Sequence, residues 1–115
     1  MKDFLRAQLE RHTQRLNELD FLLSREDIMK DMTQFMALSR EHTEVAATAG
    51  RYARYQQREA DLQAAHQMLQ DGADDADMRA MAEEEITSAQ AELLELEAEL
   101  QRMLLPKDPD DARPA

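Results

Sequence analysis

The chain contains no cysteine and no tryptophan, and its 115 residues include only two glycines, three prolines and 4% aromatic residues. Without cysteine there is neither a disulfide framework nor thiolate chemistry. Scarce aromatic residues and turn formers leave little material for a β-sheet. No apolar run approaches the roughly 18 residues of a membrane span, and the N-terminus lacks the apolar core of a secretory signal. We therefore expect an all-α, cytoplasmic protein that does not enter a membrane.

Helix-forming residues and their spacing predict three helices. Abundant alanine, leucine, methionine, glutamate, glutamine and arginine lose little conformational freedom in a helix. Apolar residues recur in steps of three and four, which predicts amphipathic helices over about 2–23, 26–70 and 75–105. The expected buried stripes are Leu5, Leu9, His12, Leu16, Leu19 and Leu23; Ile28, Met32, Phe35, Leu38, His42, Val45, Ala49, Tyr52, Tyr55, Leu62, His66 and Leu69; and Ala82, Ile86, Ala89, Leu93, Leu96, Leu100 and Met103.

The stretch QDGADDAD, from Gln70 to Asp77, is the clearest turn. Gly72 suits a left-handed helix end and Asp75 suits the start of the next helix. The third helix should therefore fold back on the second as a long antiparallel coiled-coil hairpin, with the N-terminal helix packed along part of it. Whether the second helix runs unbroken past Lys30 and Gly50 stays open. Residues 1–105 form one helical domain in this interpretation, and Pro106 ends the last helix, leaving 106–115 as a tail.

The net charge of −11 is unevenly distributed. Residues 71–99 hold 11 acidic residues and a single base, Arg79, which gives this stretch a net charge of −10. An acidic helix repels phosphate, so this stretch is a poor match for nucleic acid. It is either a solvated face that keeps the chain soluble or a docking face for a basic partner.

No pattern of residues indicates catalysis. His12 and His42 fall on predicted stripes, where a histidine is usually a packed, hydrogen-bonded residue. The acidic turn places its glycine and its twelfth residue wrongly for an EF-hand calcium loop, and the Glu83–Glu85 run is typical of a solvated surface. There is no nucleophile signature and no phosphate loop. We expect a protein that is not an enzyme, with no metal site, no cofactor and no small-molecule substrate.

Two charged clusters are candidates for partner binding. Arg51, Arg54 and Arg58 share one helix face, because their spacing is three and four residues. They either pair with the acidic third helix within the chain or contact ribosomal RNA or another polyanion. The second cluster is the acidic turn, whose candidate contact residues are Asp71, Asp74, Asp75 and Asp77.

Four stretches resemble one protein family in order and spacing. The most specific is Leu-Pro-Lys-Asp-Pro near the C-terminus, within LLPKDPDDAR. The four stretches are KDFLRAQLERHTQRLNEL (2–19), ALSREHTEV (37–45), DADMRAMAEEEI (75–86) and LLPKDPDDAR (104–113). Together they resemble the N-terminal part of bacterial class I peptide chain release factors, of the type that reads UAA and UAG. Two features depart from the family. Ala76 stands where the family often has proline, and the turn before it is longer by a few residues.

The resemblance implies an N-terminal domain in translation termination that neither reads codons nor hydrolyses the ester. The family's Gly-Gly-Gln and codon-reading tripeptide do not occur here, and residues 106–115 correspond to a linker between domains. Implied partners are the stalk base of the large ribosomal subunit, the class II release factor GTPase and the methyltransferase that modifies the family's catalytic glutamine. The alternatives are a free-standing coiled-coil adaptor and, less compatible with the acidic helix, an RNA-binding arm. The isolated domain could also form a homodimer through apolar surface.

Overall fold

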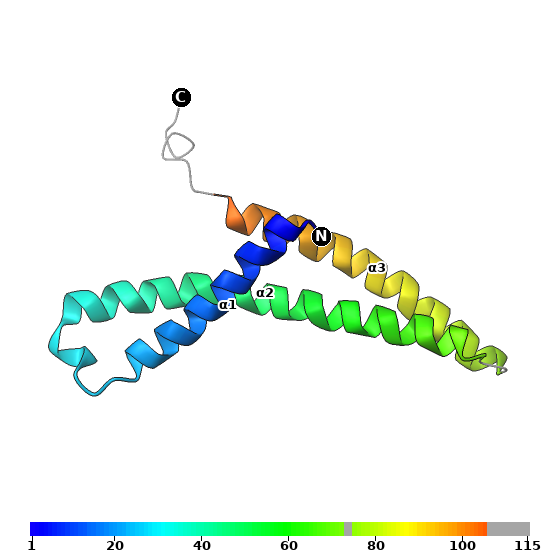
Figure 1. Cartoon of the computed structure of the whole chain (residues 1–115), viewed down its shortest axis with the longest axis horizontal. Helices are drawn as coiled ribbons and strands as arrows, with labels where there is room; N and C mark the ends of the chain where they lie inside the picture. Colours follow the sequence, from blue (N-terminus) through cyan, green and yellow to red (C-terminus); the bar gives the residue numbers. More distant parts are fainter. Residues whose placement is uncertain (73–74, 106–115) are drawn as a thin grey trace, which may run out of the picture.

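The computed structural model describes residues 1–72 and 75–105, and helices account for nearly all of this part (Figure 1). The elements are α1 (Asp3–Leu23), a short 3₁₀ turn η1 (Ile28–Lys30), α2 (Met32–Gln70) and α3 (Ala76–Leu104). Within these described ranges there is no strand, so the all-α prediction is confirmed. The tail from Pro106 to Ala115 and the turn residue Asp74 lie outside the described residues.

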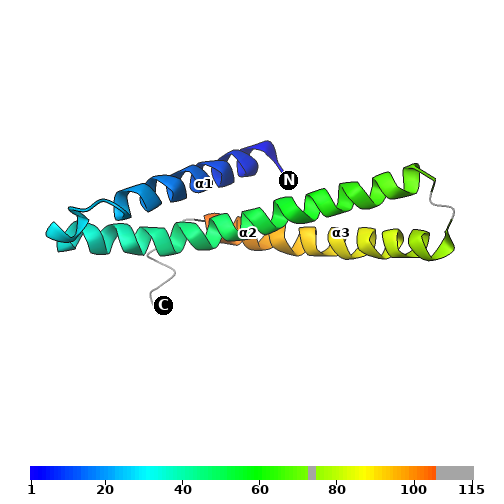
Figure 2. The ribbon, with the colours of Figure 1, turned by 90° about the horizontal axis from the view of Figure 1, so that it is seen from below.

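Helix α2 is the longest helix, and it forms one arm of each of two successive hairpins. Its 39 residues correspond to a rod of about 58 Å at the usual helical rise. Helix α1 runs antiparallel along the first half of α2, and α3 runs antiparallel along the second half (Figures 1 and 2). The three helices meet in the middle of the molecule, which confirms the expected hairpin with an additional N-terminal helix.

The helix boundaries follow from local capping. Asp31 accepts a hydrogen bond from the Gln34 backbone N–H at 3.1 Å and starts α2 after the 3₁₀ turn, so the chain does break near Lys30. Helix α2 then continues through Gly50 to Gln70. Gly72 has a φ of 77°, the left-handed conformation expected after a helix end. Asp75 accepts from the Asp77 N–H at 2.8 Å and starts α3.

The main buried cluster lies where the three helices meet, as the stripes of the first and third helices predicted. Its buried members come in pairs from α1, α2 and α3, and they are Leu5, Leu9, Tyr52, Tyr55, Leu96 and Leu100. An elongated chain buries little apolar surface elsewhere. Burial of these side chains where the three helices meet is therefore the main contribution to its stability.

The predicted stripe of the second helix was wrong in part. His66 and Met32 are exposed, and the buried column passes instead through Arg58 and Ala65. A stripe predicted from apolar residues omits arginine, so it missed Arg58. The prediction then continued at His66, which follows Ala65 and lies about 100° further around the helix. The buried column also includes Thr48, which the predicted stripe omitted, and its remaining members lie on the expected face.

The two histidines expected in the core lie at its margin. His12 Nδ1 is 2.9 Å from the Gln8 carbonyl oxygen, and His42 Nε2 is 2.7 Å from Asp20 Oδ1. Both rings are half-buried, so they are hydrogen-bonded as expected but are not packed in the interior. Among the described helices, none combines the length and the apolar character needed to cross a membrane.

Candidate partner-binding surfaces

The arginine cluster of α2 faces the acidic helix α3. Arg51 Nε lies 3.0 Å from a carboxylate oxygen of Glu99, and Arg54 contacts both oxygens of Glu92 at 2.5 and 2.9 Å. The hydrogen bonds from Arg54 lower the pKa of the Glu92 carboxyl below its usual value. The interpretation that these arginines pair within the chain is therefore confirmed, although the side chains of Arg51 and Arg54 remain 55% and 49% exposed.

Arg58 differs from its two neighbours because it is almost covered. Its side chain is 10% exposed and donates to Asp61 at 2.8 Å, to Glu85 at 2.6 Å and to the Ser88 hydroxyl at 3.3 Å. Its Nε lies 3.1 Å from Glu92 but is not aligned for a hydrogen bond. Arg58 is thus a tie between the two helices, with little surface left for a partner.

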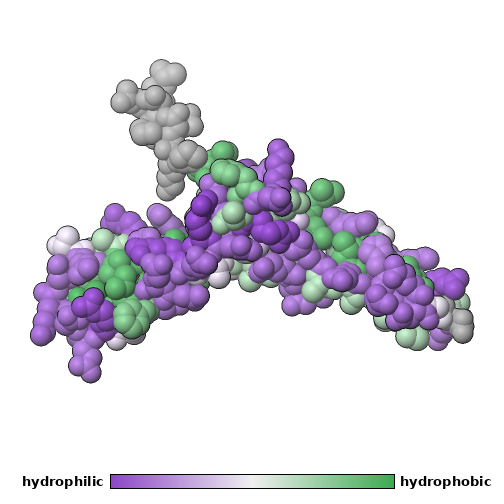
Figure 3. Space-filling model, viewed as in Figure 1, coloured by the Kyte–Doolittle hydropathy of each residue, from purple (hydrophilic) through white to green (hydrophobic). Residues whose placement is uncertain are grey.

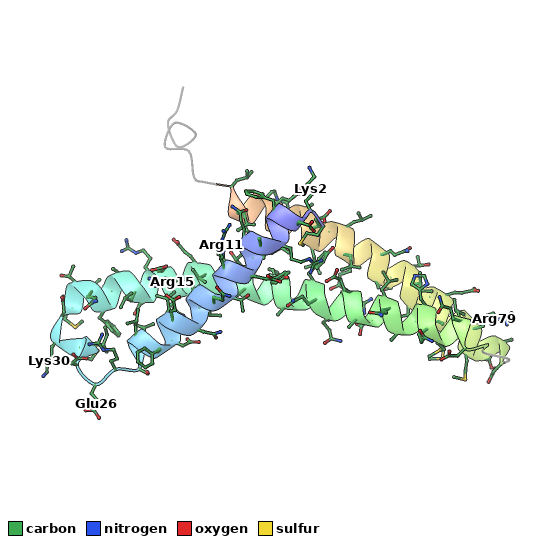
Figure 4. All side chains as sticks on the ribbon, in the orientation of Figure 1. Lys2, Arg11, Arg15, Glu26, Lys30 and Arg79 are labelled. Atoms are coloured by element: carbon green, nitrogen blue, oxygen red, sulfur yellow. The ribbon has the colours of Figure 1, made fainter. Side chains whose placement is uncertain are left out.

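Sequence reasoning missed a second set of ion pairs, which fix α1 on α2. Arg15 contacts both oxygens of Glu41 at 2.7 and 2.9 Å, and Arg6 contacts Glu59 at 2.9 Å. The Arg15 hydrogen bonds lower the pKa of Glu41. Figure 4 shows Arg15 projecting from α1 where α1 crosses α2. The only sequence signal for these pairs is opposite charge, which does not identify partners 26 and 53 residues apart.

The acidic turn forms an exposed tip at the end of the second hairpin. Asp71, Asp75 and Asp77 are all exposed, whereas Asp74 lies outside the described residues. Asp71 accepts from the Gln67 side-chain amide at 2.9 Å, and Asp75 is the cap of α3. Two of these three carboxylates thus have a structural role as well, which affects how the tip can be mutated.

Beside this tip the two helices form an open apolar groove of about 460 Å³. Three partly exposed methionines, Met68, Met78 and Met81, line it together with alanines and with Arg58, Asp61 and Glu85. None of these methionines falls on a predicted stripe, because they flank the buried column rather than occupy it. We call this feature the methionine groove.

The surface as a whole is predominantly polar, as Figure 3 shows, with hydrophobic patches at the end where α1 joins α2 and along α3. In the parts of the chain that the structure describes, no group of three or more histidine, cysteine, aspartate or glutamate side chains is placed to hold a metal ion.

Comparison with known proteins identifies clear relatives. The model of the PCRF domain family matches residues 12–115. The whole chain is 70% identical to Peptide chain release factor 1 of Albidiferax ferrireducens and 69% identical to that of Delftia acidovorans, covering 31% of each relative. A more distant relative, Peptide chain release factor 1 of Methylibium petroleiphilum, is 55% identical over 113 residues, which are 98% of this chain and 30% of that protein. No solved structure matches.

Proposed function

Because the chain belongs to the PCRF domain family, we propose that it is the N-terminal domain of a bacterial peptide chain release factor and acts in translation termination in the cytoplasm. The observation that carries the proposal is 70% identity along all 115 residues to a protein named for that function. The chain spans about 31% of the length of such relatives, so codon reading and ester hydrolysis are assigned to the remaining part.

In this proposal the domain is a non-catalytic contact module. A long two-hairpin rod joined at a single three-helix centre suits positioning, because it presents charged surface at a fixed distance from its core. The proposed partners are the stalk base of the large ribosomal subunit, the class II release factor GTPase and the glutamine methyltransferase. The tip carboxylates and the exposed parts of Arg51 and Arg54 are the proposed contact residues. Arg58 and Asp74, named with them from the sequence, stay predictions.

The tip is tested by charge neutralisation in the full-length protein that contains this chain. Asp71→Asn with Asp77→Asn should weaken ribosome association several-fold and slow peptide release, while circular dichroism shows unchanged helix content. Asp75 is left intact because it caps α3. The control variant, Glu10→Gln with Glu26→Gln, removes the same charge from α1 and from the turn after it, where Figure 4 shows Glu26 far from the tip. Equal behaviour of the two variants would refute a contact at the tip.

Arg51 requires a different design, because it also pairs with Glu99. Arg51→Glu alone loses that pair, whereas Arg51→Glu with Glu99→Arg exchanges the two charges and keeps an ion pair within the chain. If Arg51 contacts a partner, both variants associate more weakly with ribosomes although the exchanged pair regains thermal stability. Full recovery of association by the exchange would show that Arg51 acts only within the chain. If the chain is instead a free-standing adaptor, none of these variants changes ribosome association.

A further inference from the structure

The two halves of α2 are covered to different extents. Near the middle of α2, Leu5 and Leu9 of α1 pack over the line where α2 meets α3, against residues such as Tyr52 and Leu100. Arg6 of α1 still reaches Glu59 of α2, but beyond that point Figures 1 and 2 show α2 and α3 running to the tip as a pair. The methionine groove lies along this outer stretch, between α2 and α3, and no helix of the described chain covers it.

The residues of the groove suit an incoming helix. Ala64, Ala65 and Ala82 line it, with Ala65 and Ala82 buried, and small side chains allow another backbone to approach closely. Its sides are Met68, Met78 and Met81, which are 39%, 46% and 67% exposed. Methionine is flexible and polarisable, so a wall of methionines adapts to different apolar anchors, and it occurs repeatedly at peptide-binding surfaces.

The charge around the groove selects the sign of the partner. Asp61 and Glu85 line the groove, and a smaller groove along α3 adds Glu84 beside Met81. Arg58 is the base among these residues, and it is already paired with Asp61 and Glu85. The groove also lies within reach of the stretch 71–99, whose net charge is −10. This field attracts cationic ligands and repels RNA.

We propose that the methionine groove binds a basic amphipathic helix of a partner protein, with apolar side chains entering between the methionines and flanking lysines or arginines facing the carboxylates. This is the helix-in-groove mode, in which anchors at positions i, i+3, i+4 and i+7 provide the contact. The inference rests on the proposed role as a contact module and names the chemistry of one partner.

The test uses a defined probe and the eight methionine methyl groups as reporters. The probe is a synthetic peptide of about 18 residues, roughly five helical turns, with leucines on one face and lysines elsewhere. It is added to the 115-residue chain labelled at the methionine methyls and followed by NMR. We expect saturable shifts at Met68, Met78 and Met81, and no comparable shifts at Met29 and Met36, whose exposure lies within the same range and which are at the opposite end of the molecule.

Two controls separate groove binding from charge attraction. A scrambled peptide of identical composition keeps the charge but has no apolar face, and it should bind at least several-fold more weakly. Met78→Gln with Met81→Gln should reduce affinity for the patterned peptide roughly tenfold, because apolar contact area is lost. Met29→Gln with Met36→Gln should leave it unchanged.

Three outcomes would overturn the proposal: equal binding of the two peptides, shifts centred on Met29 and Met36, or equal effects of the two double variants. Sedimentation of the free chain provides a further check, because dimerisation that Met78→Gln and Met81→Gln abolish would make a second copy the occupant. These measurements do not use the ribosome. A negative result for the groove can therefore be told apart from a negative result in the ribosome experiments.

Discussion

Arg58 shows how strongly the role of one side chain depends on its neighbours. It belongs to an evenly spaced basic trio, and nothing in the sequence separates it from Arg51. In the folded chain its aliphatic part is packed and its guanidinium meets carboxylates from both α2 and α3. Such a pair costs desolvation energy, and removing one partner leaves the remaining charges poorly compensated. Arg58 therefore contributes to holding the hairpin closed.

At this scale we predict that Arg58→Ala lowers the melting temperature by several degrees and more than Arg51→Ala does. Arg51 is 55% exposed and its ion pair is screened by water and salt, whereas Arg58 is 10% exposed and also loses packing. Thermal unfolding of both variants, followed by circular dichroism, measures the difference. Equal melting temperatures would contradict the assignment of Arg58 as an inter-helix tie.

Among the helices, α2 matters most for the fold, because both hairpins require it to be continuous. Gly50 lies inside it, and a Cβ added there would meet nothing within 4 Å. Gly72 follows its C-terminus with a φ of 77°, which a residue with a side chain adopts only at a cost. The two glycines of the chain therefore have opposite roles: one weakens the helix interior and the other permits its end.

We predict opposite effects for the same substitution at these two positions. Gly50→Ala should stabilise the chain by about 0.5–1 kcal/mol, because alanine is the better helix former. Gly72→Ala should destabilise it by about 1–2 kcal/mol, because the left-handed conformation becomes strained. Urea unfolding provides both values, and the double variant should be close to their sum, since the sites lie far apart. Destabilisation by Gly50→Ala would indicate that α2 needs a weak point at its centre.

For the whole molecule, electrostatics acts in two opposing ways. Inter-helix ion pairs lower the pKa values of Glu41, through Arg15, and of Glu92, through Arg54. The pKa of Asp61 is lowered as well, mainly by a hydrogen bond from Gln57 and then by Arg58. A carboxyl whose pKa is lower in the folded chain stabilises that chain above the unfolded pKa, and loses this effect as the pH falls through the folded value. Crowded acids on α3 act in the other direction, since acid relieves their repulsion.

We predict that the ion pairs prevail and that stability falls as the pH decreases from about 5 to 3, the range in which exposed carboxyls of this type protonate. The matched variant is Arg15→Gln with Arg54→Gln, which removes the cause of the lowered pKa values of Glu41 and Glu92. Its stability should be lower near neutral pH and should depend less on pH than that of the parent chain. Urea unfolding across this range measures both slopes, and parallel slopes would show that these pairs do not control acid unfolding.

The sequence by itself determined the helices, most of their faces and the ends of two of them. Stripes such as Leu5, Leu9 and Leu19, the cap at Asp75 and the left-handed Gly72 depend on residues within one or two turns of each other. Interactions over so short a range are determined by local residue spacing, so they can be predicted without knowing the fold. The same holds for the resemblance to release factors, which the family match and the identities then confirmed.

Only the tertiary structure decided which side chains are covered and which remain free. The order in which α1 and α3 divide α2 between them buries Arg58, pairs Arg15 with Glu41 and leaves Met78 and Met81 without a covering helix. Burial and long-range pairing depend on an element many residues away, whereas periodicity records only that some partner is needed on one face. For that reason the sequence located the charged clusters but not the groove beside them.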